Sequence, residues 1–365
     1  MRDINKFRGC LIGGAVGDAL GYAVEFKDAE SIFEEYGPDG ITEYDLTNGL
    51  ALISDDTQMT LFTANGLLLA KTHGTTSYTD HIALCYKDWL KTQGTEDYGF
   101  DAPEHAWLNN IPAMNHPRAP GHTCLNYLMH DNLGTPEDPR NNSKGCGGVM
   151  RVAPVGLYFD KRHPLAEIDR LGAEAAALTH GHELGFIPAA MLAHIIHLLT
   201  YNAELSVLET VEQAKLSMTQ LFPNAKHLAA MLDLTDKAIA LAADPSMNDL
   251  EAIVQLGEGW VAEETLAIAI YCALKYENDF EKAIIASVNH SGDSDSTGAV
   301  TGNILGAHLG MKAIPKKFLT HLELKETILK IADDLCKDFD SSVEMLPTDV
   351  WARKYIYHTY PEDTN

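Results

Sequence analysis

Two clusters of acidic and hydroxyl side chains, far apart in the chain, each stand directly before a helix-length segment. The first reads Ser54-Asp55-Asp56-Thr57 and the second reads Asp293-Ser294-Asp295-Ser296-Thr297. Such residues at a helix start accept hydrogen bonds from free backbone N–H groups and suit the positive end of the helix dipole, so capping alone could explain either cluster. Together they supply four carboxylates and several hydroxyls, the hard oxygen donors that Mg²⁺, Mn²⁺ or Ca²⁺ take. We therefore predict one site shared by both segments, with room for two close metal ions.

Local metal and nucleophile motifs do not fit the sequence. An EF-hand loop that began at Asp293 would place its twelfth ligand, a bidentate acid, at Ile304. The stretch Thr179-His180-Gly181-His182 with Glu183 lacks the H-E-x-x-H spacing of zinc proteases. The chain also has no Walker loop and no G-x-S-x-G elbow. A metal site built from distant segments remains.

Two further polar groups are weaker signals when taken alone. Asp18 and Glu25 are seven residues apart, or two helical turns, and could share a helix face. The run Gly145-Cys146-Gly147-Gly148-Val149-Met150-Arg151 could bring backbone N–H groups close to phosphate oxygens, or it could be a plain tight turn.

Glycines recur at every fourth position in two segments that have helical spacing. They stand at Gly9, Gly13, Gly17 and Gly21 in the first segment, and at Gly298, Gly302 and Gly306 in the second. Four-residue spacing places each set on one helix face, and each glycine costs a helix roughly 1 kcal/mol relative to alanine. Close backbone approach would compensate. The glycines then serve tight packing alone, or the two helices pack at the centre and carry a site at their ends.

The segments that must position these residues are mostly helical. Apolar residues recur at three- and four-residue spacing in the following ranges: Leu61–Lys71, Pro188–Leu199, Val207–Leu221, His227–Ala242, Glu263–Lys275 and Glu323–Cys336. Strand-like alternation is confined to Ile41–Leu46 and Val149–Phe159, and Pro154 interrupts the second. We therefore predict an all-α, multi-helix fold.

Irregular sequence is concentrated in Lys27–Ser54 and in the proline-rich Thr92–Gly148. A loop as long as the second is functional or disordered in most compact domains. The apolar pattern resumes on both sides of each loop, so no linker is visible. Length alone suggests roughly two domains, but a shared site that joins Asp55 to Asp295 favours a single domain over residues 1–365.

Composition excludes several classes of protein and of partner. The 365 residues carry 52 Asp and Glu against 27 Lys and Arg, a net charge of −25, and 45% are hydrophobic. That is enough apolar content for a large core, and the acidity argues against nucleic acid as a partner. Six scattered cysteines without a C-x-x-C pair, and an N-terminus without an apolar signal region, predict a soluble cytoplasmic protein that needs no membrane.

These motifs together resemble the ADP-ribosylglycohydrolase family, which includes the dinitrogenase reductase-activating glycohydrolase and ADP-ribosylarginine hydrolases. The matching stretches, in family order, are Gly13 to Gly21 with Glu25, Ser54 to Thr57, Gly145 to Arg151, Leu178 to His180 and Gly292 to Ser296. They run from about residue 8 to residue 310, which is most of the chain.

The resemblance implies a metal-dependent enzyme that removes ADP-ribose from modified protein side chains. It implies two Mg²⁺ or Mn²⁺ ions held by Ser54, Asp55, Asp56, Asp293, Asp295 and Ser296. It also places Gly145, Cys146, Gly147, Gly148 and His180 against the ADP-ribose ligand, with Thr92–Gly148 near its adenosine end. Glu25, Asp55 and Asp56 are the candidates for general acid or base, and the choice among them stays open. Two divalent ions would also make an acidic cleft acceptable to a dianionic ligand.

The acceptor of ADP-ribose is the less determined part of the prediction. The stretch Thr179–His182 resembles the arginine-directed branch, so ADP-ribosylarginine is the expected substrate. Hydrolysis at serine or of O-acetyl-ADP-ribose is the alternative within the family. A third possibility is an immunity protein that also blocks an ADP-ribosyltransferase by occlusion, with Thr92–Gly148 as the plug.

Overall fold

The structure, a computed structural model, describes residues 2–94, 104–337 and 345–360. Within these ranges the chain is helical, and β-structure is limited to isolated bridges. The α-helices are α1 (Ile4–Gly21), α2 (Ala29–Tyr36), α3 (Asp55–Thr72), α4 (Tyr78–Thr92), α5 (His122–Leu128), α6 (Ala153–Tyr158), α7 (Leu165–Ala177), α8 (Glu183–Tyr201), α9 (Val207–Leu221), α10 (Leu228–Ala243), α11 (Asp249–Leu256), α12 (Ala262–Lys275), α13 (Phe280–Val288), α14 (Ser294–Leu309), α15 (Lys316–Thr320), α16 (Lys325–Cys336) and α17 (Val350–Tyr355). Short 3₁₀ turns are η1 (Trp107–Asn110), η2 (Pro112–Met114), η3 (Cys146–Gly148) and η4 (Met311–Ala313). The all-α prediction is confirmed.

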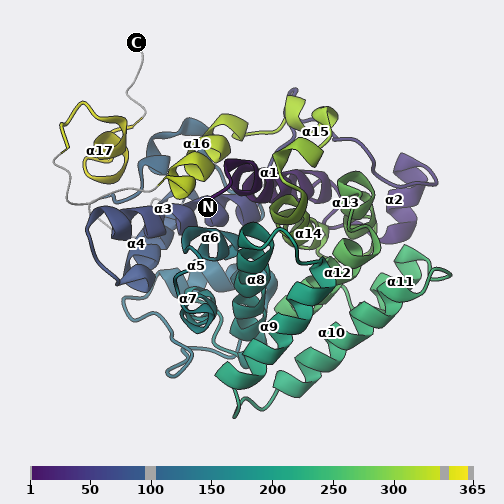
Figure 1. Ribbon diagram of the computed structural model, residues 1–365. Helices are drawn as coiled ribbons and strands as arrows, with labels where there is room; N and C mark the ends of the chain where they lie inside the picture. Colours follow the sequence, from purple (N-terminus) through teal and green to yellow (C-terminus); the bar gives the residue numbers. More distant parts are fainter. Residues whose placement is uncertain (1, 95–103, 338–344, 361–365) are drawn as a thin grey trace.

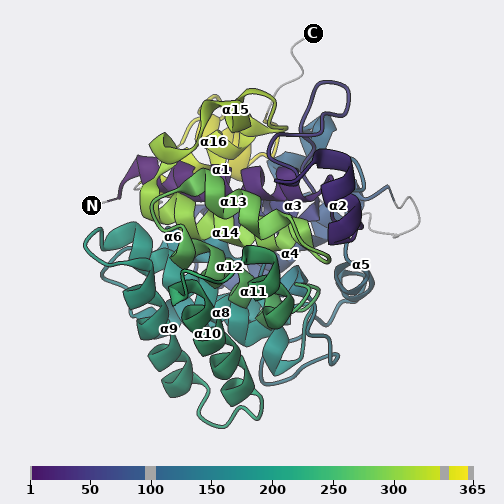
Figure 2. The ribbon, with the colours of Figure 1, turned by 90° about the vertical axis from the view of Figure 1, so that its right-hand side faces the viewer.

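The helices α1 and α14 lie side by side at the centre of the molecule (Figures 1 and 2). A Cβ atom added at Gly9, Gly13, Gly17 or Gly21 would come within 2.3 Å of the backbone oxygen of Gly306, Gly302, Gly298 or Ser294, in that order. The numbers rise along one helix as they fall along the other, so the helices are antiparallel. The glycine faces therefore allow close backbone contact, and the C-terminal end of α1 meets the N-terminal end of α14. We call this contact the glycine spine.

Other helices surround the spine and bury their apolar faces against it and each other. α3 and α4 lie on one side, whereas α9 and α10 form an outer pair far from α17 (Figure 1). Among the described residues, only α8 is long and apolar enough to cross a membrane, and its apolar window is entirely buried inside the fold. Its hydrophobicity is therefore explained by core packing.

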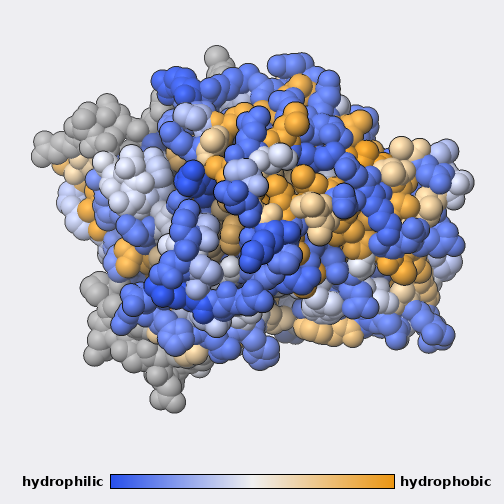
Figure 3. All heavy atoms as spheres, turned by 90° about the horizontal axis from the view of Figure 1, so that it is seen from below, coloured by the Kyte–Doolittle hydropathy of each residue, from blue (hydrophilic) through white to orange (hydrophobic). Residues whose placement is uncertain are grey.

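The face of the molecule seen from below carries many hydrophilic residues, with hydrophobic groups in patches between them (Figure 3). Large apolar side chains that are exposed on outer helices include Leu208, Leu216 and Val254. Scattered exposure of this kind is normal for globular proteins.

The predicted helices are present, with shifts of a few residues at their ends. Leu61–Lys71 lies inside α3, which begins six residues earlier, at Asp55. Pro188–Leu199 lies inside α8, which begins at Glu183 because the His182 side chain caps it by accepting from the N–H of Leu184. Neither of the two segments with strand-like alternation forms a strand, in agreement with the all-α prediction. Val149–Phe159 contains α6, where Pro154 occupies the first turn, a position that needs no N–H donor.

The two irregular segments contain short helices. Lys27–Ser54 holds α2, and the described part of Thr92–Gly148 holds α5 and the turns η1, η2 and η3. Pro103 and its neighbours from residue 95 lie outside the described residues, so the predicted plug is only partly covered.

Candidate active site

Three chain segments converge where the glycine spine ends. They are the turn that follows α1, the first turn of α3 and the first turn of α14. Asp18 of α1 joins two of them, because its carboxylate accepts hydrogen bonds from the backbone N–H groups of Ser54 (2.8 Å) and Thr57 (3.0 Å) and from the Thr57 hydroxyl. Asp18 therefore caps α3 from a neighbouring helix and sets the position of the first acidic cluster against the spine. Burial, and then the charge of Asp295, raise the pKa of Asp18 to about 7.

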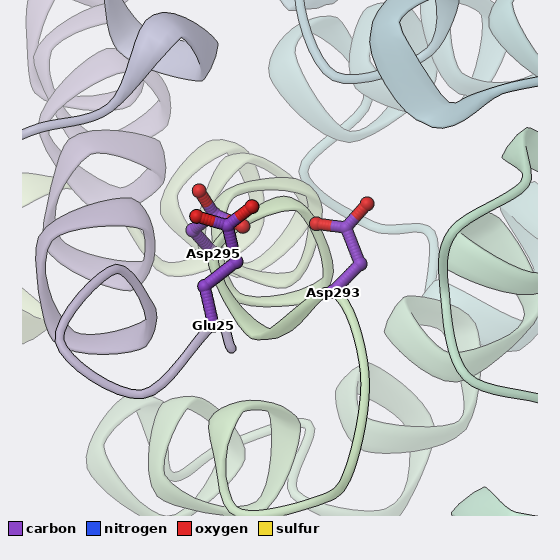
Figure 4. Close-up of side chains that lie close together, drawn as sticks. All are labelled: Glu25, Asp293 and Asp295. Carbon is purple, nitrogen blue, oxygen red and sulfur yellow. The ribbon is translucent and has the colours of Figure 1, made fainter. Parts of the chain in front are cut away.

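The turn after α1 carries Glu25 to the second acidic cluster. One carboxylate oxygen each of Glu25, Asp293 and Asp295 lie within 4.8 Å of one another, and all three side chains are buried. Figure 4 shows Glu25 arriving from the segment after α1, while both aspartates come from the start of α14. Oε2 of Glu25 has no hydrogen-bond partner within the described part of the chain. Burial, followed by repulsion from Asp295 and Asp293, raises the pKa of Glu25 to about 10.

The first acidic cluster faces the same space. Asp55 Oδ2 accepts the backbone N–H of Gly121 at 3.0 Å, which orients that carboxylate. Ser54 caps α3 and donates its hydroxyl to Asp56 Oδ2 at 3.3 Å, while Asp56 Oδ1 is buried without a partner. Burial is the main cause that raises the pKa values of Asp55 and Asp56 well above the ordinary range, and the charge of Asp295 adds to it.

This donor set fits divalent cations. Among the described residues, none of the carboxylates of Glu25, Asp55, Asp56, Asp293 and Asp295 forms an ion pair with Lys, Arg or His. A buried carboxylate without a positive partner is costly, and a cluster of them adds mutual repulsion. Oxygen donors that converge from separate helix ends, with two buried oxygens left unpartnered, are what a hard cation requires.

The carboxylates line a cleft of about 570 Å³, which is in the size range of small-molecule sites. Most of the predicted site residues line it: Glu25, Asp55, Asp56, Gly145, Cys146, Gly147, His180, Asp293, Asp295 and Ser296. Two do not. Ser54 is fully buried as the cap of α3, and Gly148 packs behind the wall, where a Cβ would lie 2.7 Å from the backbone oxygen of Gly185. Ser54 can thus act through its hydrogen bond to Asp56, while Gly148 shapes the turn.

The glycine turn η3 packs against the His180 ring. A Cβ on Gly147 would lie 2.9 Å from His180 Cε1, and one on Gly145 would lie 3.3 Å from Nε2. The backbone N–H of Cys146 donates to the carbonyl oxygen of Trp260, which fixes the turn to the segment before α12. Glycine is thus needed here so that His180 can reach the cleft wall.

Several residues that line the cleft were not predicted from the sequence. Phe26 and Trp260 stack at its mouth, with ring centroids 6.1 Å apart and planes 22° apart, and both line the cleft. The wall also includes Pro120, His122 and Cys124 from Thr92–Gly148, the segment predicted to border the ligand. No spacing signal joins Phe26 to Trp260, because only the fold brings these positions together.

Comparison with known proteins identifies the family. The family model for ADP-ribosylglycohydrolase matches residues 1–343. ADP-ribosylhydrolase ARH3 of Mus musculus is 26% identical, with 93% of this chain and 94% of the relative covered. The ADP-ribosyl-[dinitrogen reductase] glycohydrolase of Rhodospirillum rubrum is 24% identical (87% and 90% covered), and the ADP-ribosylarginine hydrolase Tri1 of Pseudomonas putida is 25% identical (91% and 78% covered).

A solved structure shares the fold. The chain described as an ADP-ribosylglycohydrolase-related protein complex superposes with a TM-score of 0.56 at 24% identity, over 91% of this chain and 97% of the other. The family match over nearly the whole length agrees with the helical architecture and with the motifs gathered in the cleft. The chain therefore belongs to the ADP-ribosylglycohydrolase family, a family of glycosidases.

Proposed function

We propose that this protein hydrolyses the glycosidic bond between ADP-ribose and a modified protein side chain, with ADP-ribosylarginine as its preferred substrate. The observation that carries the proposal is the set of buried, unpaired carboxylates on one side of a cleft of about 570 Å³. The named relatives support the reaction class, since ADP-ribosyl hydrolase names recur among them.

The acidic clusters are the proposed binding site for two Mg²⁺ or Mn²⁺ ions. The proposed ligands are Ser54, Asp55, Asp56, Asp293, Asp295 and Ser296, of which Ser54 would need to give up its hydrogen bond to Asp56. When bound, the ions supply positive charge and Lewis-acid polarisation to a cleft that otherwise repels a diphosphate.

The chain's own residues position the ligand and handle its proton. Glu25, Asp55 and Asp56 line the cleft, so any of the three can exchange a proton with a water molecule or with the leaving group. The turn at Gly145–Gly147 and His180 form the wall against which a diphosphate would lie.

An arginine acceptor is favoured by the mouth of the cleft. The stacked Phe26 and Trp260 rings line the same cleft as Glu25. A planar guanidinium group stacks on aromatic faces and is attracted by nearby carboxylates, whereas a serine side chain offers neither a plane nor a charge. The relative from Pseudomonas putida is itself named an ADP-ribosylarginine hydrolase.

The test measures release of ADP-ribose from two protein substrates, one modified on arginine and one on serine. We expect faster release from arginine in Mg²⁺ or Mn²⁺, no release in EDTA, and loss of release in Asp55→Ala and Asp295→Ala. Asp39→Ala, on an exposed turn away from the cleft, is the matched control and should keep full activity. Full activity in EDTA would contradict the metal site, and faster release from serine would contradict the proposed acceptor.

A further inference from the structure

A chain of hydrogen bonds leads from the protein interior to His180 in the cleft wall. Arg151 Nη2 donates to Thr179 Oγ1 at 2.8 Å, and Thr179 Oγ1 lies 2.8 Å from His180 Nδ1. All three side chains are buried, with exposed fractions of 0%, 0% and 2%. Bulk water therefore does not compete for these hydrogen bonds. We call the series Arg151–Thr179–His180 the relay.

Arg151 is held in place by groups other than Thr179. Its Nη2 also donates to the carbonyl oxygens of Ala175 (2.9 Å) and Ala176 (3.4 Å), at the C-terminal end of α7, where the helix dipole favours a positive charge. Its guanidinium lies 4.3 Å from the centroid of the Tyr86 ring. Arg151 thus fixes the end of α7, and Thr179 and His180 follow directly on that end.

Counting donors and acceptors determines the direction of the relay. A guanidinium can only donate, so Thr179 Oγ1 must accept from Arg151. The single hydroxyl proton of Thr179 is then free to point at Nδ1 of His180. The Cys124 thiol competes for that proton, because it also lies within reach of Thr179. Sulfur is a weak acceptor, however, and Cys124 Sγ already accepts from Arg151 Nη1 at 3.4 Å.

The other ring nitrogen of His180 faces the cleft. Nε2 has no hydrogen-bond partner among the described residues, and it lies beside Gly145 and Gly147 of the lining. Burial, and then the charge of Arg151, lower the pKa of His180 to about 3. The ring is therefore neutral near pH 7, with one nitrogen a donor and the other an acceptor.

We propose that Arg151 and Thr179 are positioning residues that hold His180 as the Nε2–H tautomer, so that Nε2 donates a hydrogen bond to an anionic oxygen of the ligand in the cleft. The tautomer is a property of the free protein. Only the second step, donation to the ligand, rests on the proposed function, with a diphosphate oxygen of ADP-ribose as the acceptor.

The first measurement tests the tautomer without any ligand. Protein labelled with ¹⁵N at histidine is examined by NMR near pH 7, and His180 is assigned from the resonances lost in His180→Asn. We expect one tautomer, with Nε2 protonated and Nδ1 shifted as a hydrogen-bonded acceptor. Thr179→Val, which keeps the shape but removes the hydroxyl, should move the Nδ1 resonance to the position of a free acceptor, and Thr179→Ser should restore it. Cys124→Ala should leave it unchanged.

The second measurement tests donation to the ligand by calorimetric titration with ADP-ribose in Mg²⁺. Thr179→Val should bind about fivefold more weakly, as expected for one poorly held hydrogen bond, and Thr179→Ser should bind like the wild type. A wild-type His180 protonated at Nδ1 overturns the proposal even if no variant folds. Unchanged ADP-ribose affinity in Thr179→Val, alongside the expected NMR shift, overturns only the second step. Absence of ADP-ribose binding to the wild type would instead contradict the proposed function.

Discussion

Along the glycine spine, α1 and α14 lie so close that backbone atoms of the two helices meet, whereas at the end of the same two helices acidic side chains lie close together. In the spine, a single added methyl at Gly17 would fall 1.9 Å from the backbone oxygen of Gly298. In the acidic cluster, Glu25 and Asp56 each keep a buried oxygen that has no hydrogen-bond partner among the residues that the structure describes. The spine leaves no space for a Cβ at its contact positions, while the cluster lines a cleft and lacks positive charge.

The difference explains how like charges can be held close together. The last contact of the spine is Gly21 against Ser294, between the two aspartates of α14 and four residues before Glu25. Backbone contact therefore sets where Glu25, Asp293 and Asp295 stand, without attraction between them. The rigid region lets the site stay open to a ligand or to cations instead of rearranging to relieve repulsion.

The largest effect should come from adding one methyl group to the spine. In Gly17→Ala the new Cβ meets a backbone carbonyl of a buried helix, so α14 must move. We expect the free energy of unfolding to fall by about 3 kcal/mol, even though alanine favours helix, and activity to fall with it. Urea unfolding measures the loss.

Gly14→Ala is the matched control on the same helix. Its Cβ would meet the side-chain amide of Asn303, whose Nδ2 donates to the carbonyl oxygen of Cys10 at 2.9 Å, and not a backbone atom, while the gain in helix propensity is the same. A smaller loss of stability is expected. Equal losses in the two variants would show that backbone contact is not what makes the spine intolerant.

Sequence reasoning could find both regions but not how they meet. Four-residue glycine spacing and two acidic clusters before helices are local patterns, and they predicted the spine and the shared site. The pairing of Gly17 with Gly298 depends on the register of two helices far apart in the chain. Asp18 as the cap of α3 and the stack of Phe26 on Trp260 depend on that same register.

The strand-like alternation in Val149–Phe159 misleads for a physical reason. Val149–Phe159 is rich in β-branched and aromatic residues, which favour strands in general. Tertiary context overrides this preference, because α6 is wholly buried and packs against α8. Pro154, which counted against a strand, is compatible with the first turn of a helix.

A smaller effect on the free energy of unfolding should come from pH, because the acidic cluster titrates and the glycine contacts do not. In metal-free protein the pKa of Asp18 is raised to about 7 and that of Glu25 to about 10. A carboxyl group with a raised folded-state pKa stabilises the fold while protonated. That stabilisation is complete below the unfolded pKa of about 4 and is lost as pH rises toward the folded value. The free energy of unfolding in EDTA should therefore fall between about pH 5 and pH 8, by up to about 1.4 kcal/mol per pH unit for each proton.

Urea unfolding between about pH 5 and pH 8 gives the slope of the unfolding free energy against pH. Two variants show which residues cause that slope. Glu25→Gln removes one titrating group from the cluster, so its slope should be shallower than that of the wild type. Gly14→Ala adds a methyl group to α1 without changing any titrating group, so it should keep the wild-type slope. Saturating Mg²⁺ should flatten the wild-type curve, because bound cations favour the ionised carboxylates. The same slope in all these conditions would mean that the cluster does not oppose folding.

The smallest effect is expected from substitutions at the mouth of the cleft. This part of the site differs from the buried spine and the buried acidic cluster, because Phe26 is 75% exposed and Trp260 is 39% exposed. Phe26→Ala removes one face for a stacked guanidinium, so KM for ADP-ribosylarginine protein should rise by about twofold to fivefold, at unchanged kcat and unchanged stability. Phe26→Tyr keeps the ring and should behave like the wild type. Steady-state kinetics on arginine- and serine-modified substrates measure the difference. An equal rise in KM for both substrates would show that the ring is a general wall of the cleft, and a fall in kcat would place it nearer to the reacting bond than to the acceptor.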